Sequence, residues 1–364
     1  MIKRLIYLQY GFWKKMRSGD SVEEKRLFWD LYGALECSNI RADIPPEEWA
    51  DDKDDLLYYL IQNSYDGNGT EVEEYVPEKI QEALNFNKEQ PIENYCGVYL
   101  LDENTQMCKE HSNQLGVLCL NAEMIKEFHR FVRGDAVMYE KDEAYDQFEK
   151  CASQLESPCN SMILIDPYIV FNKWSIELNL IPLLDKCLPP DPKIQEDQHV
   201  VFHLSILSQT NECNIGKYRD KLRYNEIYDY IHKEIKRIRP KMKMLFSLYH
   251  INTTGNGNGD FHSRHIITNT MLVNSEDGFD IFKNQKNEYT KKWETVSGKY
   301  ARFEFLYPTL IDNQRLDAAN YYRWIQLSAN NRKDNTLSWG DKKNRLFDLF
   351  SDFNEVPSNS IMIR

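Results

Sequence analysis

Three apolar-rich segments of strand length occur in the second half of the chain, the first of them a continuous apolar run, and they limit what the chain can fold into. They span residues 161–169, 199–207 and 243–250. A continuous apolar run is typical of a strand that is buried on both faces, as in parallel sheets covered by helices. Helical patterns at 175–187 and 218–239 separate the three segments. The sequence therefore predicts an α/β fold with a mainly parallel or mixed sheet flanked by helices.

The first half predicts elements of the same class. The expected strands span 2–10, 97–102 and 115–121, and the expected helices span 21–37, 56–63, 122–133 and 141–154. Ser21 and Glu24 form a capping-box pattern at the start of the first of these helices. No flexible linker rich in Gly, Ser or Pro separates the two halves of the chain at 150–160. We therefore expect an α/β region over 1–155 that packs closely on a domain formed by 156–364.

Composition narrows the classes of partner. The chain has 364 residues and a formal charge of −12. This net charge repels anions, so phosphate or nucleic acid would have to bind at a local cluster of positive side chains. No apolar segment reaches the length of a membrane span. Eight cysteines are scattered without a disulfide framework, which indicates a reducing, cytoplasmic compartment. Cys108 and His111 have a metal-like spacing but no second such pair nearby, so we expect no metal and no cofactor.

A Gly/Asn-rich loop at 253–259 leads into a short segment that carries chemistry. His262 and Arg264 are two residues apart at the expected start of a strand, and alternation places them on the same face. An imidazole can attack or protonate a phosphoryl group while a guanidinium neutralises its oxygens. Asn269 follows five residues after Arg264.

The pattern His262-x-Arg264-x4-Asn269 resembles the His-x-Lys-x4-Asp signature of the phospholipase D superfamily. Arg264 stands where that signature has lysine, and Asn269 stands where it has aspartate. The pattern is closer still to the phospholipase D-like domain at the end of some microtubule-interacting-and-trafficking proteins and in uncharacterised bacterial proteins. Several of those domains keep the fold and have lost the chemistry. The order of strands and helices in the second half is the order that the resemblance implies.

The resemblance implies binding without efficient turnover. Phospholipase D chemistry needs one histidine to attack phosphorus and a second to protonate the leaving group, and the chain has a single copy of the motif. Asn269 cannot hold an imidazolium as an aspartate does. We expect a catalytically degenerate phospholipase D-like module in a bacterial assembly, such as an anti-phage defence or mobile-element system. Its ligand would be a phosphate-containing molecule, a nucleic acid or a partner protein.

Two alternatives remain open. In one, the protein is a phosphodiesterase or nuclease whose composite site is completed by homodimerisation, with His262 and Arg264 from each subunit. In the other, the first half holds a separate nuclease that uses Asp102, which follows an apolar strand.

Further phosphate contacts are expected from two segments outside the motif. The first is the glycine-rich loop before it, and the second is a basic run near the end of the chain, which also fits a helix cap or a surface turn. The residues concerned are Gly257, Gly259, Lys342, Lys343 and Arg345.

Overall fold

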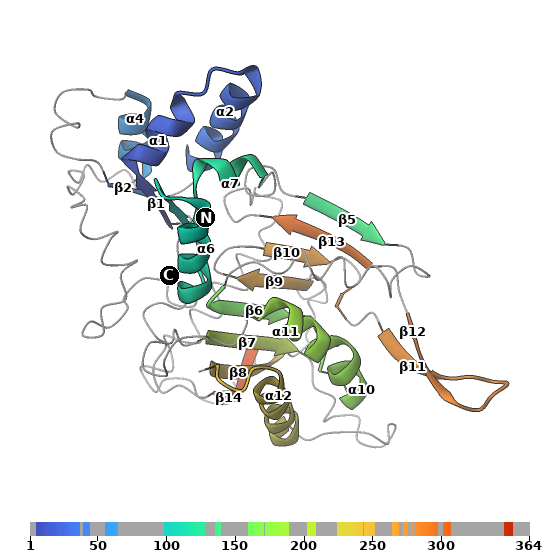
Figure 1. Ribbon diagram of the computed structural model, residues 1–364. Coiled ribbons are helices and arrows are strands. Elements are labelled where there is room, and N and C mark those ends of the chain that lie inside the picture. The colour runs from blue at the N-terminus through green and yellow to red at the C-terminus, as the bar shows by residue number, and fades with distance from the viewer. Residues whose placement is uncertain are drawn as a thin grey trace.

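The structure, a computed structural model, is an α/β protein with parallel and mixed sheets flanked by helices, which confirms the predicted fold class (Figure 1). A four-stranded and an eight-stranded sheet each have their own buried core, and a two-stranded ribbon projects from the second. The residues that the structure describes are 5–36, 39–43, 55–64, 98–127, 135–139, 159–170, 172–188, 202–208, 224–242, 244–251, 264–268, 272–275, 278–279, 282–297, 301–306 and 346–351.

The first sheet is parallel, with the strand order β2-β1-β3-β4. Its strands are β1 (Leu5–Gln9), β2 (Asn39–Asp43), β3 (Val98–Leu100) and β4 (Leu118–Leu120). Its helices are α1 (Tyr10–Arg17), α2 (Val22–Glu36), α4 (Asp55–Ser64), α6 (Thr105–Leu115) and α7 (Ala122–Glu127). Parallel neighbours need crossover connections, and helices supply them here.

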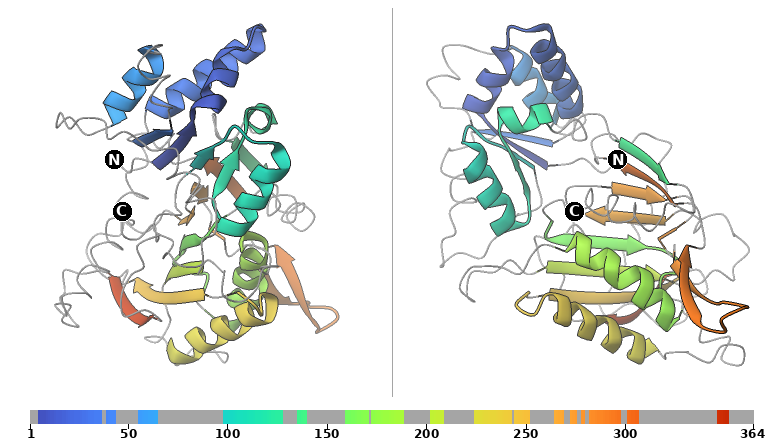
Figure 2. Two further views of the ribbon diagram at one scale, coloured as in Figure 1. Left: turned by 60° about the vertical axis from the view of Figure 1, so that its left-hand side comes forward. Right: turned by 45° about the vertical axis from the view of Figure 1, so that its right-hand side comes forward.

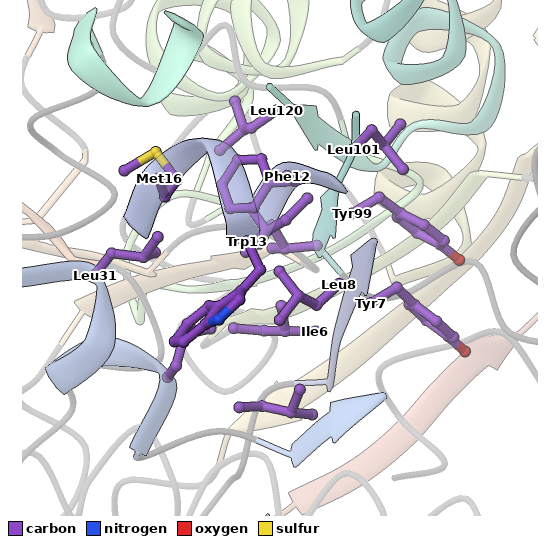
Figure 3. Close-up of a cluster of buried hydrophobic side chains, with 14 of the residues drawn as sticks. Ile6, Tyr7, Leu8, Phe12, Trp13, Met16, Leu31, Tyr99, Leu101 and Leu120 are labelled. Atoms are coloured by element: carbon purple, nitrogen blue, oxygen red, sulfur yellow. The ribbon is translucent and has the colours of Figure 1, made fainter. Parts of the chain in front are cut away.

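Large apolar side chains fill the space between this sheet and its helices (Figure 3). Trp13 and Phe12 on α1 are fully buried, as is Leu8 on β1. Tyr7 and Tyr99 stack on neighbouring strands with their ring centroids 4.6 Å apart. Burying aromatic rings of this size contributes much of the stability of such a small sheet.

Local capping explains where two helices of the first sheet begin. The Ser21 hydroxyl accepts a hydrogen bond from the Glu24 backbone N–H, and the Glu24 carboxylate accepts one from the Ser21 N–H, so the predicted capping box is confirmed. The Asn104 side chain accepts from the Met107 N–H and starts α6, which the sequence analysis did not predict. Gly116 ends α6 in the left-handed conformation.

The second sheet is mixed, with the strand order β14-β8-β7-β6-β9-β10-β13-β5. Its strands are β5 (Asp135–Tyr139), β6 (Ser161–Ile165), β7 (Phe202–Ser208), β8 (Met244–Ile251), β9 (Arg264–Thr268), β10 (Leu272–Ser275), β13 (Ala301–Leu306) and β14 (Leu346–Ser351). The strands β6, β7 and β8 are parallel, as the apolar-rich segments predict. The strands β9 and β10 are antiparallel, because the segment 269–271 between them is too short for a crossover.

Helices cover one face of β6, β7 and β8 (Figure 1). They are α10 (Lys173–Ser175), the π-helical turn η1 (Ile176–Leu180), α11 (Ile181–Cys187) and α12 (Tyr224–Ile238). Ile227, Ile231 and Ile235 of α12 are buried against the sheet, as their spacing predicts. The side chains that alternate into this core include Leu164 on β6 and Ile266 on β9.

A two-stranded ribbon is inserted between β10 and β13 and stands away from the sheet (Figure 2). It consists of β11 (Phe282–Lys286) and β12 (Trp293–Ser297), which pair antiparallel. Neither strand was predicted from the sequence. The ribbon begins at Phe282, which is buried in the core, so its root is fixed while its tip lies in solvent.

Several predicted elements differ from the observed ones. The predicted strand at 2–10 ends at Gln9, where α1 begins. The strand β5 was not predicted; it lies within 1–155 and yet pairs with β13 of the second sheet. The domain border at residue 155 therefore stays a prediction. The predicted helix at 141–154 lies outside the described residues, and none of the described helices is long and apolar enough to cross a membrane.

Gly116 provides a test of how α6 meets the second sheet. Its φ is +63°, and a Cβ there would lie 2.7 Å from the Cys159 carbonyl oxygen, just before β6. We expect Gly116→Ala to lower the free energy of unfolding by at least about 1–2 kcal/mol, because the left-handed conformation alone costs an L-residue that much. Urea denaturation followed by circular dichroism measures this.

Gly33 is the matched control, because it lies inside α2 and a Cβ there would meet nothing within 4 Å. Gly33→Ala should raise the free energy of unfolding by about 0.5–1 kcal/mol. If the urea midpoint of Gly116→Ala equalled that of the wild type, Gly116 would not have the left-handed conformation and the close approach to Cys159 described above.

Candidate functional site

The carboxyl edge of the second sheet is the candidate ligand site. The chain runs from β6 to β7 and β8 on one side of β6, and β9 lies on its other side. In open α/β sheets, ligands bind beyond the carboxyl ends of the strands where the strand order changes direction in this way. Asp166 and Tyr168 follow the carboxyl end of β6 at this point.

Arg264 is the predicted site residue that the structure places at this edge. Ile165 pairs with His265, so Arg264 lies opposite Asp166, the residue just after the end of β6. The Arg264 side chain is half-buried, and its guanidinium carbon is 5.7 Å from the centre of the Tyr168 ring. This geometry is that of a cation–π contact. The ring thereby orients the guanidinium, whose Nε atom is buried.

Asp166 shapes this edge from inside the fold. Its side chain is fully buried, and the two carboxylate oxygens accept hydrogen bonds from the backbone N–H groups of Tyr168 (2.8 Å) and Phe279 (2.7 Å). The hydroxyl of Ser275, at the end of β10, accepts from the Gly278 N–H and donates to the Gly278 carbonyl, both at 3.0 Å. Asp166 thus fixes the loops around Arg264. No pattern in the sequence pointed to Phe279 as the partner of Asp166.

The remaining predicted phosphate-site residues lie outside the described part of the chain and stay predictions. They are His262, Asn269, Gly257, Gly259, Lys342, Lys343 and Arg345. Leu346, which follows the basic run in the sequence, pairs with Ile251 at the carboxyl end of β8.

The face of the second sheet that points away from α11 and α12 carries buried polar side chains that sequence analysis missed. His203 and Ser205 on β7, Ser247 on β8 and His265 on β9 are all nearly inaccessible to solvent. Burial lowers the pKa of His203 to about 4. The signal was the alternation of polar residues within the run 199–207, which was interpreted only as an apolar strand.

Asp102, the candidate of the alternative nuclease, lies at the carboxyl edge of the first sheet. Its backbone N–H donates to the Gln9 side chain at 2.7 Å, and its carboxylate forms an ion pair with Lys15 of α1. A Cβ at Gly11 would collide with that carboxylate, so the first turn of α1 packs directly on it. These contacts account for Asp102 as the residue that joins β1, β3 and α1.

Metal binding has no support in the described part of the chain. No group of three or more His, Cys, Asp or Glu side chains there is arranged to hold a metal ion. Cys108 is fully buried, and burial together with Glu103 raises its pKa to about 11. His111 lies 3.2 Å from the Glu103 carboxylate. Cys108 and His111 both lie on α6, and both side chains are buried.

Comparison with known proteins adds no family. No protein-family model matches the chain, and no curated protein matches it. The resemblance to the phospholipase D superfamily therefore rests on the motif residues themselves and on the order of strands and helices.

His203 predicts a pH dependence of stability. Because the folded state keeps this imidazole neutral down to about pH 4, the unfolded state, with an ordinary pKa of 6.5, binds a proton first as the pH falls. The free energy of unfolding should be unaffected by His203 above pH 6.5. It should fall by up to about 3 kcal/mol between pH 6.5 and pH 4.

The measurement is urea denaturation of the wild type and His203→Gln at several pH values across this range. The substitution removes the titrating group, so the difference in the free energy of unfolding between the two proteins should shrink or reverse as the pH falls. Parallel curves for the two proteins would show that His203 does not titrate in this way.

Proposed function

We propose that this protein is a phospholipase D-like binding module that holds a phosphate-bearing ligand at the carboxyl edge of its second sheet, without efficient hydrolysis. The observation that carries the proposal is the placement of Arg264. It stands beside the buried end of β6, half-buried and stacked near Tyr168. A cation held there by the fold faces the side of the sheet where ligands of α/β proteins bind.

Arginine suits this task for physical reasons. Its planar guanidinium binds two phosphate oxygens at once, and a neighbouring aromatic ring orients it. The chain as a whole is strongly acidic, with a net charge of −12. Long-range attraction therefore does not concentrate an anion at the protein, and affinity depends on the local site.

Binding without turnover follows from the motif. The loss of one acid–base partner of a catalytic pair costs about 10²–10⁴ in rate, whereas an arginine–phosphate contact does not need that partner. The single His262, with Asn269 in place of the expected aspartate, fits this loss. The setting that the resemblance implies is a bacterial assembly, for example in defence against phage or in a mobile element.

Arg264→Ala should weaken phosphate binding by about tenfold or more, because a hydrogen bond to a charged group contributes about 1.5–3 kcal/mol. Arg264→Lys should restore only part of the affinity, since an ammonium lacks the two-pronged geometry. Isothermal titration calorimetry with inorganic phosphate and with a 5′-phosphorylated dinucleotide measures both. Arg26→Ala removes the same charge from the exposed surface of α2 and should leave binding unchanged.

His262→Ala separates a binder from an enzyme. We expect it to change the affinity for phosphate little, because there is almost no reaction to lose. The assay is hydrolysis of bis(4-nitrophenyl) phosphate by the wild type and by this variant. Ordinary turnover by the wild type that disappears in His262→Ala would overturn the binding module in favour of a phosphodiesterase completed by homodimerisation.

A further inference from the structure

The β11–β12 ribbon leaves the second sheet at the same edge as Arg264. Ser275 ends β10 at this edge, and β13 begins there, because it runs antiparallel to β10. The ribbon lies between these two strands in the chain and projects beyond the body of the sheet (Figures 1 and 2).

The root of the ribbon is rigid. Asn179 on the π-helical turn η1 is almost fully buried, and its side chain bonds both backbone groups of Phe282. Its Oδ1 accepts from the Phe282 N–H at 2.7 Å, and its Nδ2 donates to the Phe282 carbonyl at 2.9 Å. The Phe282 ring packs into the core. The ribbon therefore leaves the sheet in a fixed direction.

The tip of the ribbon is also built into one conformation. The Asn287 side chain accepts hydrogen bonds from the backbone N–H groups of Tyr289 (2.9 Å) and Thr290 (3.0 Å). Lys291 has a φ of 59°, and its N–H donates to the Asn287 carbonyl at 3.0 Å. This ordered turn presents the Tyr289 ring to solvent, 95% exposed, beside the exposed Lys292.

The chemistry of the tip differs from that of the rest of the chain. Residues 286–292 contain three lysines and one glutamate, in a protein with a net charge of −12. An aromatic ring beside lysines on an ordered turn matches the two contacts that single-stranded nucleic acids offer, namely a base face for stacking and phosphates for charge.

We propose that the β11–β12 ribbon is an arm that binds single-stranded nucleic acid, with Tyr289 stacking on an unpaired base and Lys291 and Lys292 contacting its phosphates. This inference rests on the proposed function for one point, that the ligand carries phosphates. It adds the class of ligand, and it adds a contact to the base, which Arg264 does not explain.

The test is fluorescence anisotropy with a labelled oligothymidylate of about 20 nucleotides. Tyr289→Ala should weaken binding about 5-fold to 150-fold, the range for losing one stacked base. Lys291→Ala/Lys292→Ala should weaken it as well, and should reduce the slope of log affinity against log salt by about 1.4, because each lost phosphate contact contributes about 0.7.

Matched variants elsewhere on the surface control for loss of an aromatic ring and of two charges. Tyr59→Ala removes a half-exposed tyrosine from α4, and Lys109→Ala/Lys233→Ala removes two exposed lysines from α6 and α12. Both should bind the oligothymidylate as the wild type does. Equal losses in the control and the ribbon variants would overturn the proposal.

Other outcomes identify what fails. If a duplex of the same length bound as tightly and ignored Tyr289→Ala, or if polyglutamate competed as well as the oligothymidylate, the arm would not be a single-strand binder. If inorganic phosphate bound through Arg264 while the oligothymidylate did not bind, the ribbon proposal would fail and the proposed function would stand. If the oligothymidylate bound in a way that depends on Tyr289 and no phosphate bound at Arg264, the ribbon proposal would stand and the proposed function would fail.

Discussion

The buried carboxylate of Asp166 is the interaction on which the edge of the second sheet depends. It accepts backbone hydrogen bonds from Tyr168, two residues away, and from Phe279, 113 residues away. Burying a carboxylate is costly unless hydrogen bonds to it replace water, and these two do so. Tyr168 lies against Arg264, and Phe279 stands shortly before the ribbon. One side chain therefore fixes both the candidate anion site and the approach to the β11–β12 arm.

Much of the fold could be predicted because its signals are local. The apolar-rich segments predicted β6, β7 and β8, and the helical pattern at 218–239 predicted α12. The helix α1 was missed because Gln9, which precedes it, makes no capping hydrogen bond through its side chain, and Gly11 lowers helix propensity. Tertiary packing decides there: Trp13 is fully buried. The sequence does carry signals for the helix α6, namely Asn104 before its first residue and Gly116 after its last. They were missed because Gly116 was assigned to the predicted strand at 115–121.

The candidate site could be predicted only in part, for a reason of distance along the chain. A motif spacing pointed to Arg264, but the ring that contacts it belongs to Tyr168, on a different segment. The nearby Asp166 is held by the backbone N–H of Phe279, on a third segment. Side-chain contacts between residues about a hundred positions apart leave no periodic trace in a single sequence. The same holds for Asn179, which lies inside a helical pattern and yet fixes the root of the ribbon at Phe282.

Strand direction explains how a motif at the start of a strand reaches this site. In a wholly parallel sheet, the first residue of a strand lies at the amino edge, far from the carboxyl ends where ligands bind. The strand β9 runs antiparallel to β6, so Arg264 at its start lies at the carboxyl edge. The strand β14 also runs antiparallel to its neighbour β8, and it begins at the same edge with Leu346. The mixed character of the sheet is therefore what places Arg264 and Leu346 at the same edge as the carboxyl ends of β6, β7 and β8.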